Sequence, residues 1–178
     1  MWIIGRVGLI QVLGVMGRFM RFAALALSAI GICGPAHAGG SAAGTVNRLY
    51  RDFAWEAVVA SPNAAGLAQQ PKGVLLRYFT PRLAAALAAD DACTKRRGEI
   101  CSLDFMPIWG SQDPAAEELQ VTPGAAPEQV TVRYTYPSTG QVISLDYRLV
   151  QTKVGWRVSD ILYQSGDSLA HLLSAESR

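Results

Sequence analysis

Apolar side chains recur every three or four positions between residues 45 and 60, which is the spacing of an amphipathic helix. The stripe consists of Val46, Leu49, Tyr50, Phe53, Ala54, Ala57 and Val58. Thr45 is placed to cap this helix, and Ser61-Pro62-Asn63 is expected to end it. Trp55 lies off the stripe and is therefore a candidate for a residue that faces a groove.

A second helical segment is predicted to begin near Gly73 and to restart at Thr80-Pro81. Thr80 suits the cap position, and Pro81 suits the first turn, where its missing N–H is not needed. The apolar stripe then continues through Leu83, Ala84, Leu87 and Ala88. We expect Asp90-Asp91 to end the helix.

The pattern changes to strict alternation in the second half of the chain. Apolar Val130, Val132, Tyr134 and Tyr136 alternate with polar residues, as do Ile143, Leu145, Tyr147 and Leu149, and then Trp156 and Val158. Alternation of this kind predicts antiparallel strands with one covered face. Residues 137–140 and 153–155 are the turns between them, residues 119–122 form a further short strand, and Leu169, Leu172 and Leu173 mark a closing helix.

Helices followed by a meander of strands predict an α+β fold. We expect N-terminal helices packed on a curved antiparallel sheet of three to four strands, with a short C-terminal helix. Such a sheet, wrapped on helices, forms a cone with a pocket at its mouth. The fold therefore predicts a place for a small apolar ligand but does not by itself assign a function.

The first 38 residues have the pattern of a cleavable export signal. Arg21 precedes an apolar run over residues 22–33, and Pro35 precedes the small residues Ala36 and Ala38 that a signal peptidase requires. This run is shorter than the roughly 20 residues of a membrane-spanning helix, so no transmembrane anchor is expected after processing. Translation can begin at Met1, Met16 or Met20. We expect a single mature domain over residues 39–178, which is either located in the periplasm or secreted.

Removing the signal changes the charge of the protein. The whole chain carries 16 Lys and Arg against 14 Asp and Glu. Arg6, Arg18 and Arg21 leave with the signal, so 13 basic residues face 14 acidic ones and the net charge becomes about −1. Nucleic-acid binding is not expected, because it needs a strong basic excess.

Cys93 and Cys101 are the cysteines that the mature domain keeps. In an oxidising compartment such a pair predicts a disulfide. The alternatives are two free thiols or a metal site, and the metal site is disfavoured because no histidine lies nearby. The loop between the cysteines carries the basic cluster Lys95, Arg96 and Arg97, a candidate surface for an acidic partner or a simply solvated charge run.

Candidate ligand-binding residues are aromatic or polar residues of the second half of the chain: Trp109, Gln112, Asp113, Tyr134 and Tyr147. Asp113 also suits a turn, and the tyrosines also suit core positions with a polar tip. His171 is the one histidine left after processing, and no nucleophile motif accompanies it. We therefore name no catalytic residue, metal or cofactor.

Three motifs resemble a known family. Tyr78-Phe-Thr-Pro-Arg-Leu83 is similar to the helix restart of cone-shaped domains such as nuclear transport factor two and ketosteroid isomerase. Asp104-Phe-Met-Pro-Ile108 with Gln112-Asp113, and Gly155-Trp-Arg-Val-Ser-Asp-Ile161 with the closing leucines, resemble the envelope domain of unknown function 3828. The resemblance covers residues 46–173 and implies a cone fold and an envelope address. It implies no catalytic residue, and the cysteine pair departs from the family pattern.

Three functions are compatible with these observations. The first is a non-catalytic module that binds a small apolar ligand or an envelope protein. The second is an inhibitor- or immunity-type protein that binds its partner through a sheet face or the Cys93–Cys101 loop. The third, disfavoured by the lack of a nucleophile motif, is an isomerase- or cyclase-like enzyme in which a Tyr hydroxyl and a carboxylate stabilise an enolate.

Overall fold

The structure is a computed structural model that describes residues 40–58 and 65–174. The expected signal segment 1–38, with Ala36 and Ala38, lies outside these residues. The elements are α1 (Ala42–Phe53), η1 (Ala54–Ala57), η2 (Leu67–Gln69), α2 (Lys72–Leu75), α3 (Pro81–Arg97), β1 (Glu117–Pro123), β2 (Gln129–Tyr136), β3 (Gln141–Thr152), β4 (Gly155–Leu162) and α4 (Leu169–Leu172). The predicted α+β class, with N-terminal helices, an antiparallel sheet and a short last helix, is confirmed.

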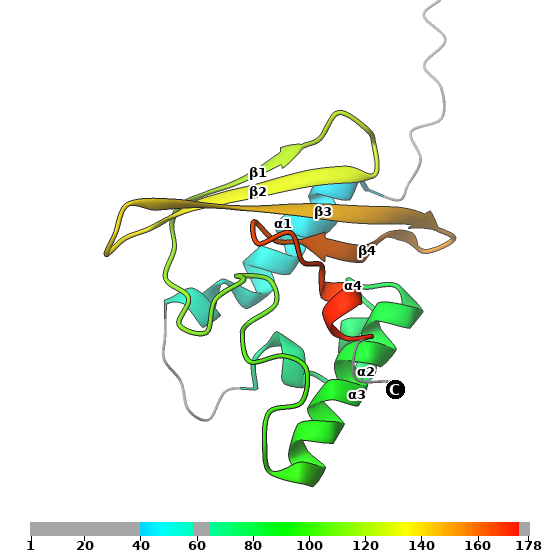
Figure 1. Ribbon diagram of the computed structural model, residues 1–178. Coiled ribbons are helices and arrows are strands. Elements are labelled where there is room, and N and C mark those ends of the chain that lie inside the picture. Colours follow the sequence, from blue (N-terminus) through cyan, green and yellow to red (C-terminus); the bar gives the residue numbers. More distant parts are fainter. Residues whose placement is uncertain (1–39, 59–64, 175–178) are drawn as a thin grey trace, which may run out of the picture. The chain divides into compact units, whose positions relative to one another are not determined.

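The four strands form one open antiparallel sheet in the order β1-β2-β3-β4 (Figure 1). The register sets Val132 against Leu145, and Tyr147 against Ile161. These residues are buried, whereas Asp146 and Arg148 on the other face are exposed. The alternation along the sequence thus corresponds to one covered and one solvated face.

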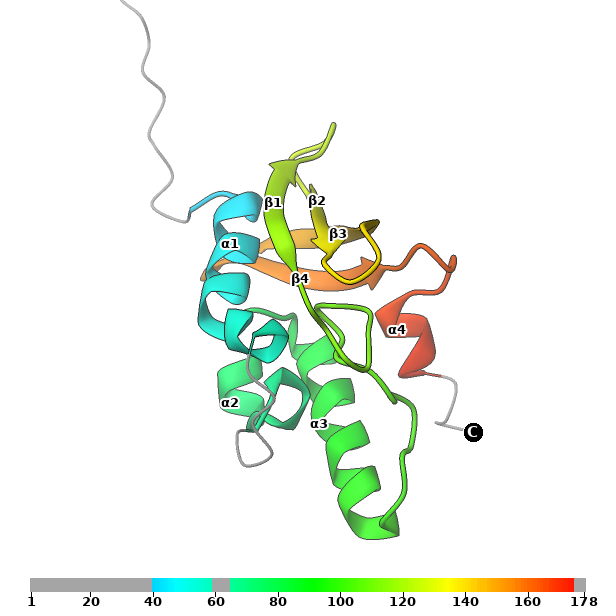
Figure 2. The same cartoon turned by 90° about the vertical axis from the view of Figure 1, so that its left-hand side faces the viewer.

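Helix α1 lies against the covered face of the sheet, and α3 meets the sheet mainly at β4. Figures 1 and 2 show α1 beside the sheet and α3 running away from it. The end of α3 near the sheet is fixed by backbone bonds, because Val158 of β4 donates its N–H to the carbonyl of Tyr78 at 2.8 Å and accepts from the N–H of Thr80 at 2.9 Å. The side chains between helices and sheet form one buried cluster that includes Leu49, Leu83 and Leu145.

Both ends of α1 differ from the prediction. Ser41, not Thr45, caps α1: its Oγ accepts from the N–H of Gly44 at 2.9 Å, while Thr45 lies buried within the helix. The regular part of that helix ends at Phe53 and a 3-10 turn follows. The helical prediction for residues 59 and 60 falls outside the described residues.

Helix α3 continues beyond Asp90-Asp91 to Arg97, so that Cys93 and the basic cluster belong to the helix and not to a loop. Its sequence contains six Ala, three Arg and two Leu, which all have high helix propensity. Three basic residues in the last turn interact favourably with the helix dipole. Gly98 then ends the helix in the left-handed conformation, with φ 71°. Within the described part of the chain, no helix is long and apolar enough to span a membrane.

Candidate functional site

A pocket of about 880 Å³ lies beside α3, on the side formed by η1, η2 and the connection to the sheet. We call it the α3 pocket. Its lining residues are Trp55, Glu56, Ala57, Val58, Gly66, Ala68, Gln69, Asp90, Asp91, Thr94, Ile100, Leu103, Asp104, Phe105, Met106, Pro107, Gln112, Asp113, Pro114, Ala115 and Tyr136. The volume is in the range of sites for small organic ligands. Trp55 lines this pocket, in agreement with its position off the helical stripe.

Apolar side chains dominate one part of the wall. Leu103, Phe105 and Met106 come from the 100–115 segment, and all three are partly exposed. Ile100 is 61% exposed and Val58 is 77% exposed. Apolar surface that stays in contact with water is unfavourable, so this wall can gain free energy from an apolar ligand.

Glu56 is a buried carboxylate in the same wall, only 5% exposed. Its Oε1 accepts the backbone N–H of Leu67 at 2.5 Å, and its Oε2 accepts the indole N–H of Trp109 at 3.1 Å. Burial raises the pKa of Glu56, and the two hydrogen bonds act in the opposite direction. Among the described residues, the ion pairs are Arg51–Asp52, Lys95–Asp91 and Arg97–Glu99, and so no basic side chain neutralises Glu56.

Gly66 lets the carboxylate approach this closely. A Cβ at residue 66 would lie 2.8 Å from Oε1 of Glu56 and 2.8 Å from Oε1 of Gln69. The Gln69 side chain is exposed and can move away, but the Glu56 carboxylate is fixed by its two donors. A side chain at residue 66 would therefore displace the acid.

Tyrosine hydroxyls hold the inner part of the 100–115 segment. Three successive carbonyls accept from them: Pro107 from Tyr163 at 3.0 Å, Ile108 from Tyr50 at 2.5 Å and Trp109 from Tyr134 at 2.5 Å. The donors come from α1, β2 and the chain after β4. A segment without helix or strand is thus fixed by side chains, which satisfies its buried backbone groups.

Three of the five predicted ligand-binding residues lie in the core. Trp109 is 1% exposed and packs edge-on against Tyr50 and Tyr134, with ring centroids 5.1 and 5.5 Å apart. Tyr147 shares a hydrogen bond of 2.9 Å with the hydroxyl of Tyr50. Burial raises the pKa of Tyr147 well above its usual value and that of Tyr134 to about 12. These hydroxyls stay neutral and are occupied by protein partners.

The other two predicted residues, Gln112 and Asp113, line the α3 pocket. Gln112 donates its side-chain N–H to Oδ2 of Asp104 at 2.9 Å. The backbone carbonyl of Asp113 accepts the hydroxyl of Tyr136 at 2.9 Å. All three residues of the Gln112, Asp113 and Asp104 group are exposed, so they form the outer rim.

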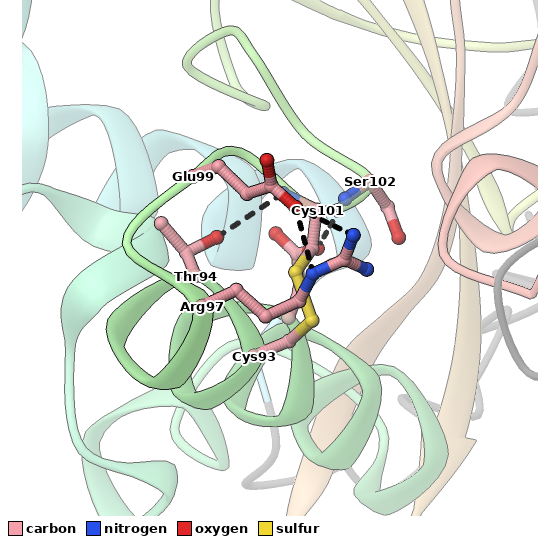
Figure 3. Close-up of a disulfide and its surroundings, with 7 residues drawn as sticks. Cys93, Thr94, Arg97, Glu99, Cys101 and Ser102 are labelled. Atoms are coloured by element: carbon pink, nitrogen blue, oxygen red, sulfur yellow. Dashed lines mark hydrogen bonds and ion pairs between the residues drawn. A yellow bond between two sulfur atoms is a disulfide. The ribbon is translucent and has the colours of Figure 1, made fainter.

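The predicted disulfide between Cys93 and Cys101 is confirmed (Figure 3). Two hydrogen bonds accompany it: Cys101 N–H to Oγ1 of Thr94 at 3.3 Å, and Ser102 N–H to Oδ1 of Asp90 at 2.7 Å. Because Thr94 and Asp90 belong to the pocket wall, the disulfide joins the two sides of the α3 pocket at this end.

The basic cluster lies in the last turn of α3, and two of its three members are paired with acids. Lys95 contacts Asp91 at 2.7 Å. Arg97 contacts Glu99 at 2.6 Å (Figure 3). Both basic side chains are largely exposed, so the two pairs contribute little to stability. They reduce the positive charge that the cluster offers to a partner.

Glu56 is the charged residue of the pocket wall with the lowest exposure, and it was not among the predicted ligand-binding residues. It follows Leu49 by seven residues and Phe53 by three, so it falls on the apolar stripe of the first predicted helix. A charged residue on a buried stripe is unusual, because burial of a carboxylate is costly. The position of Glu56 on this stripe is therefore the sequence feature that could have identified it as a site residue. Groups of three or more metal-binding side chains are absent from the described ranges 40–58 and 65–174.

Comparison with known proteins assigns no family to the chain. No family model matches it, and no curated protein matches it. Among solved structures it is similar to a phospholipid-binding protein from Ralstonia solanacearum in complex with a phospholipid. The sequence identity is 18%, the match covers 75% of this chain and 83% of the other, and the TM-score is 0.41. A likeness of this degree carries no functional argument, so the function proposed for this chain rests on its own residues.

Proposed function

We propose that this protein is a non-catalytic binding module that holds a small, largely apolar ligand in the α3 pocket. The observation that carries the proposal is the pocket itself, about 880 Å³ in volume, with Trp55, Phe105 and Met106 in its wall. Ligand sites are typically concave, mostly apolar and equipped with a few polar groups. Glu56 and the two acids of the outer rim, Asp104 and Asp113, supply the polar groups here.

Covering the exposed apolar wall supplies the driving force. Ile100 and Val58 expose most of their surface, and each side chain covered by a ligand contributes roughly 1 kcal/mol or more to binding. The wall is also firmly held, because the disulfide and the tyrosine hydrogen bonds fix the 100–115 segment. A wall that is already ordered loses little entropy when a ligand binds.

A binding role is favoured over an isomerase-like one by the state of the tyrosines. Enolate stabilisation needs a hydroxyl that is free to donate to the reacting oxygen. The hydroxyls of Tyr50 and Tyr134 donate to backbone carbonyls, and that of Tyr147 contacts Tyr50. All three side chains are at most 2% exposed.

We further propose that the module works in the cell envelope and is related to the domain of unknown function 3828. The export-like pattern of residues 1–38 supports the address. The Cys93–Cys101 disulfide also favours an oxidising compartment. The motifs Asp104-Phe-Met-Pro-Ile108 with Gln112-Asp113, and Gly155-Trp-Arg-Val-Ser-Asp-Ile161, which resemble that family, support the relationship.

A partner-binding inhibitor is the alternative function, and the basic cluster supports it less than the pocket supports a ligand. Lys95 and Arg97 already contact carboxylates, so an acidic partner would have to displace these contacts. The ligand hypothesis needs no such exchange at the apolar wall.

The test uses the neutral apolar dye 1-N-phenylnaphthylamine and a variant that fills the pocket. Ala115 lines the α3 pocket, so Ala115→Trp should occupy it, whereas Ala89→Trp adds the same side chain at an exposed position of α3 outside the lining. We expect dye fluorescence to rise with the unaltered protein and with Ala89→Trp, and to fall sharply with Ala115→Trp. Absence of binding to the unaltered protein, or equal binding to both variants, would refute the proposal.

A further inference from the structure

We infer that the natural ligand of the α3 pocket is an amphiphilic cation, with an apolar body and an ammonium group that pairs with Glu56. The inference rests on the function proposed above and narrows it to one chemical class. It stands on the position of one buried carboxylate in the wall of a large, partly apolar cavity.

The first step is that Glu56 has no counter-charge in the described protein. The acid is 5% exposed, and it accepts from two neutral donors, the N–H of Leu67 and the indole of Trp109. A buried charge is normally paired, because hydrogen bonds from neutral donors compensate only part of the lost hydration. A cation delivered by a ligand would complete the compensation.

The second step is that the carboxylate retains acceptor capacity. Each carboxylate oxygen has two lone-pair directions, and each oxygen of Glu56 uses one. The open side is kept free by Gly66, which also lines the α3 pocket and whose missing side chain would otherwise contact Oε1. An ammonium group in the pocket can therefore donate to Glu56 without breaking either existing bond.

The third step is the sign of the remaining charges. Asp90, Asp91, Asp104 and Asp113 also line the α3 pocket, and no described lining residue is Lys, Arg or His. Lys95 neutralises Asp91 from outside the lining. The resulting negative field attracts a cation and repels an anion of the same shape. These aspartates therefore favour the same class of ligand, a cation, as Glu56 does.

The experiment compares three ligands with one skeleton and different charge: 4-phenylbutylamine, 4-phenylbutanol and 4-phenylbutanoate. Each is titrated against the protein loaded with 1-N-phenylnaphthylamine, and displacement gives its dissociation constant. We expect the amine to bind about tenfold more tightly than the alcohol, since a charged hydrogen bond is the difference between them. The carboxylate should bind most weakly.

Variants locate the charge that is responsible. Glu56→Gln should abolish the preference of the amine over the alcohol. The matched variant Glu128→Gln, which removes an exposed acid directly before β2, should keep it. If Asp113→Asn abolishes the preference and Glu56→Gln retains it, the cation binds at the rim and the assignment to Glu56 is wrong. Equal binding of all three compounds, or tighter binding of the carboxylate, overturns the inference but leaves the binding module standing.

Salt dependence of the unaltered protein provides a test that needs no variant, should Glu56→Gln fail to fold. At about 1 M NaCl the screening length is only about 3 Å, which weakens exposed charge pairs far more than buried ones. We expect the ratio of amine to alcohol affinity to persist at that salt concentration. A ratio that falls to one would mean that exposed rim acids hold the cation, against the inference. Failure of the dye to bind at all refutes the proposed function itself.

Discussion

Trp109 donates its indole N–H to the carboxylate of Glu56 across a distance of 3.1 Å. The two residues are 53 positions apart in the chain, one directly after α1 and the other in the segment that leads to the sheet. The bond connects the core, in which the Trp109 ring is buried, to the wall of the α3 pocket, which Glu56 lines. Stability and the proposed ligand binding should therefore depend on the same side chain.

Glu56→Ala should destabilise the fold. The change leaves the N–H of Leu67 and the indole of Trp109 without acceptors in a buried place, and each unsatisfied donor costs about 1–3 kcal/mol. Urea unfolding measures the loss. The exposed Glu128→Ala should change the free energy of unfolding by about 0.5 kcal/mol or less, so equal effects of the two variants would disprove the structural role of Glu56.

Asp52 and Tyr78 should make stability fall in acid. The Tyr78 hydroxyl donates to Oδ2 of Asp52 at 2.5 Å, and this bond lowers the pKa of the aspartate. A carboxyl group with a lowered pKa contributes stability above its unfolded pKa and loses it as the pH falls through the folded value. Tyr78→Phe keeps the ring that packs on Phe53 but removes the bond.

The measurement is urea unfolding of both proteins at about pH 7 and about pH 3. We expect the difference in free energy of unfolding between the unaltered protein and Tyr78→Phe to be larger at the higher pH. A carbon-detected NMR titration should also show the pKa of Asp52 moving upward in the variant. A difference that is independent of pH would show that the contribution of the hydroxyl does not depend on the charge of Asp52, against this prediction.

Two tyrosines of β2 offer a matched comparison of buried and exposed hydrogen bonds. Tyr134 donates to the buried carbonyl of Trp109, and Tyr136 donates to the exposed carbonyl of Asp113. Tyr134→Phe should lower the free energy of unfolding by about 1–3 kcal/mol, because the buried carbonyl of Trp109 is left without a donor. In Tyr136→Phe, water can replace the lost donor, so the loss should be smaller. Thermal unfolding of the two variants distinguishes these outcomes. Similar melting temperatures would contradict the claim that tyrosine hydroxyls hold the carbonyls of residues 107–109 in place.

Removing the disulfide should weaken both stability and binding. The bond closes a loop between residues eight positions apart, for which chain entropy gives about 2–3 kcal/mol. The double variant Cys93→Ser/Cys101→Ser should lose that amount in urea unfolding. It should also bind 1-N-phenylnaphthylamine less tightly, because Ile100 and Leu103 lose their attachment to α3. Unchanged dye affinity in a destabilised variant would separate the disulfide from the site.

The strands could be predicted because their alternation reflects burial directly. Val132, Tyr134, Leu145 and Tyr147 all face the core as expected. Helix ends were harder to predict than strands. Asp90-Asp91 suggested a stop, but α3 continues to Arg97 and ends at the left-handed Gly98. The local sequence contains both start and stop signals for a helix, but it does not show which of them prevails.

The site was harder to predict than the fold. Gln112 and Asp113 line the α3 pocket, but Trp109, Tyr134 and Tyr147 fill the core instead. The reason is that the pocket wall belongs to the 100–115 segment, whose course is set by side-chain bonds from distant elements and has no periodicity. In the sequence, the only sign of a role for Glu56 is that a charged residue occupies a position on the apolar stripe of the first helix.

Chemical-shift mapping with 1-N-phenylnaphthylamine tests the central claim, that the α3 pocket is the ligand site, most directly. We expect the amide signals of Gly66, Thr94 and Ile100, which come from three different walls of the pocket, to shift together as the dye is added. The amides of Thr131 and Ser144, on the sheet, should stay unchanged. Shifts confined to the sheet, or no saturable shift at the three pocket residues, would contradict the account.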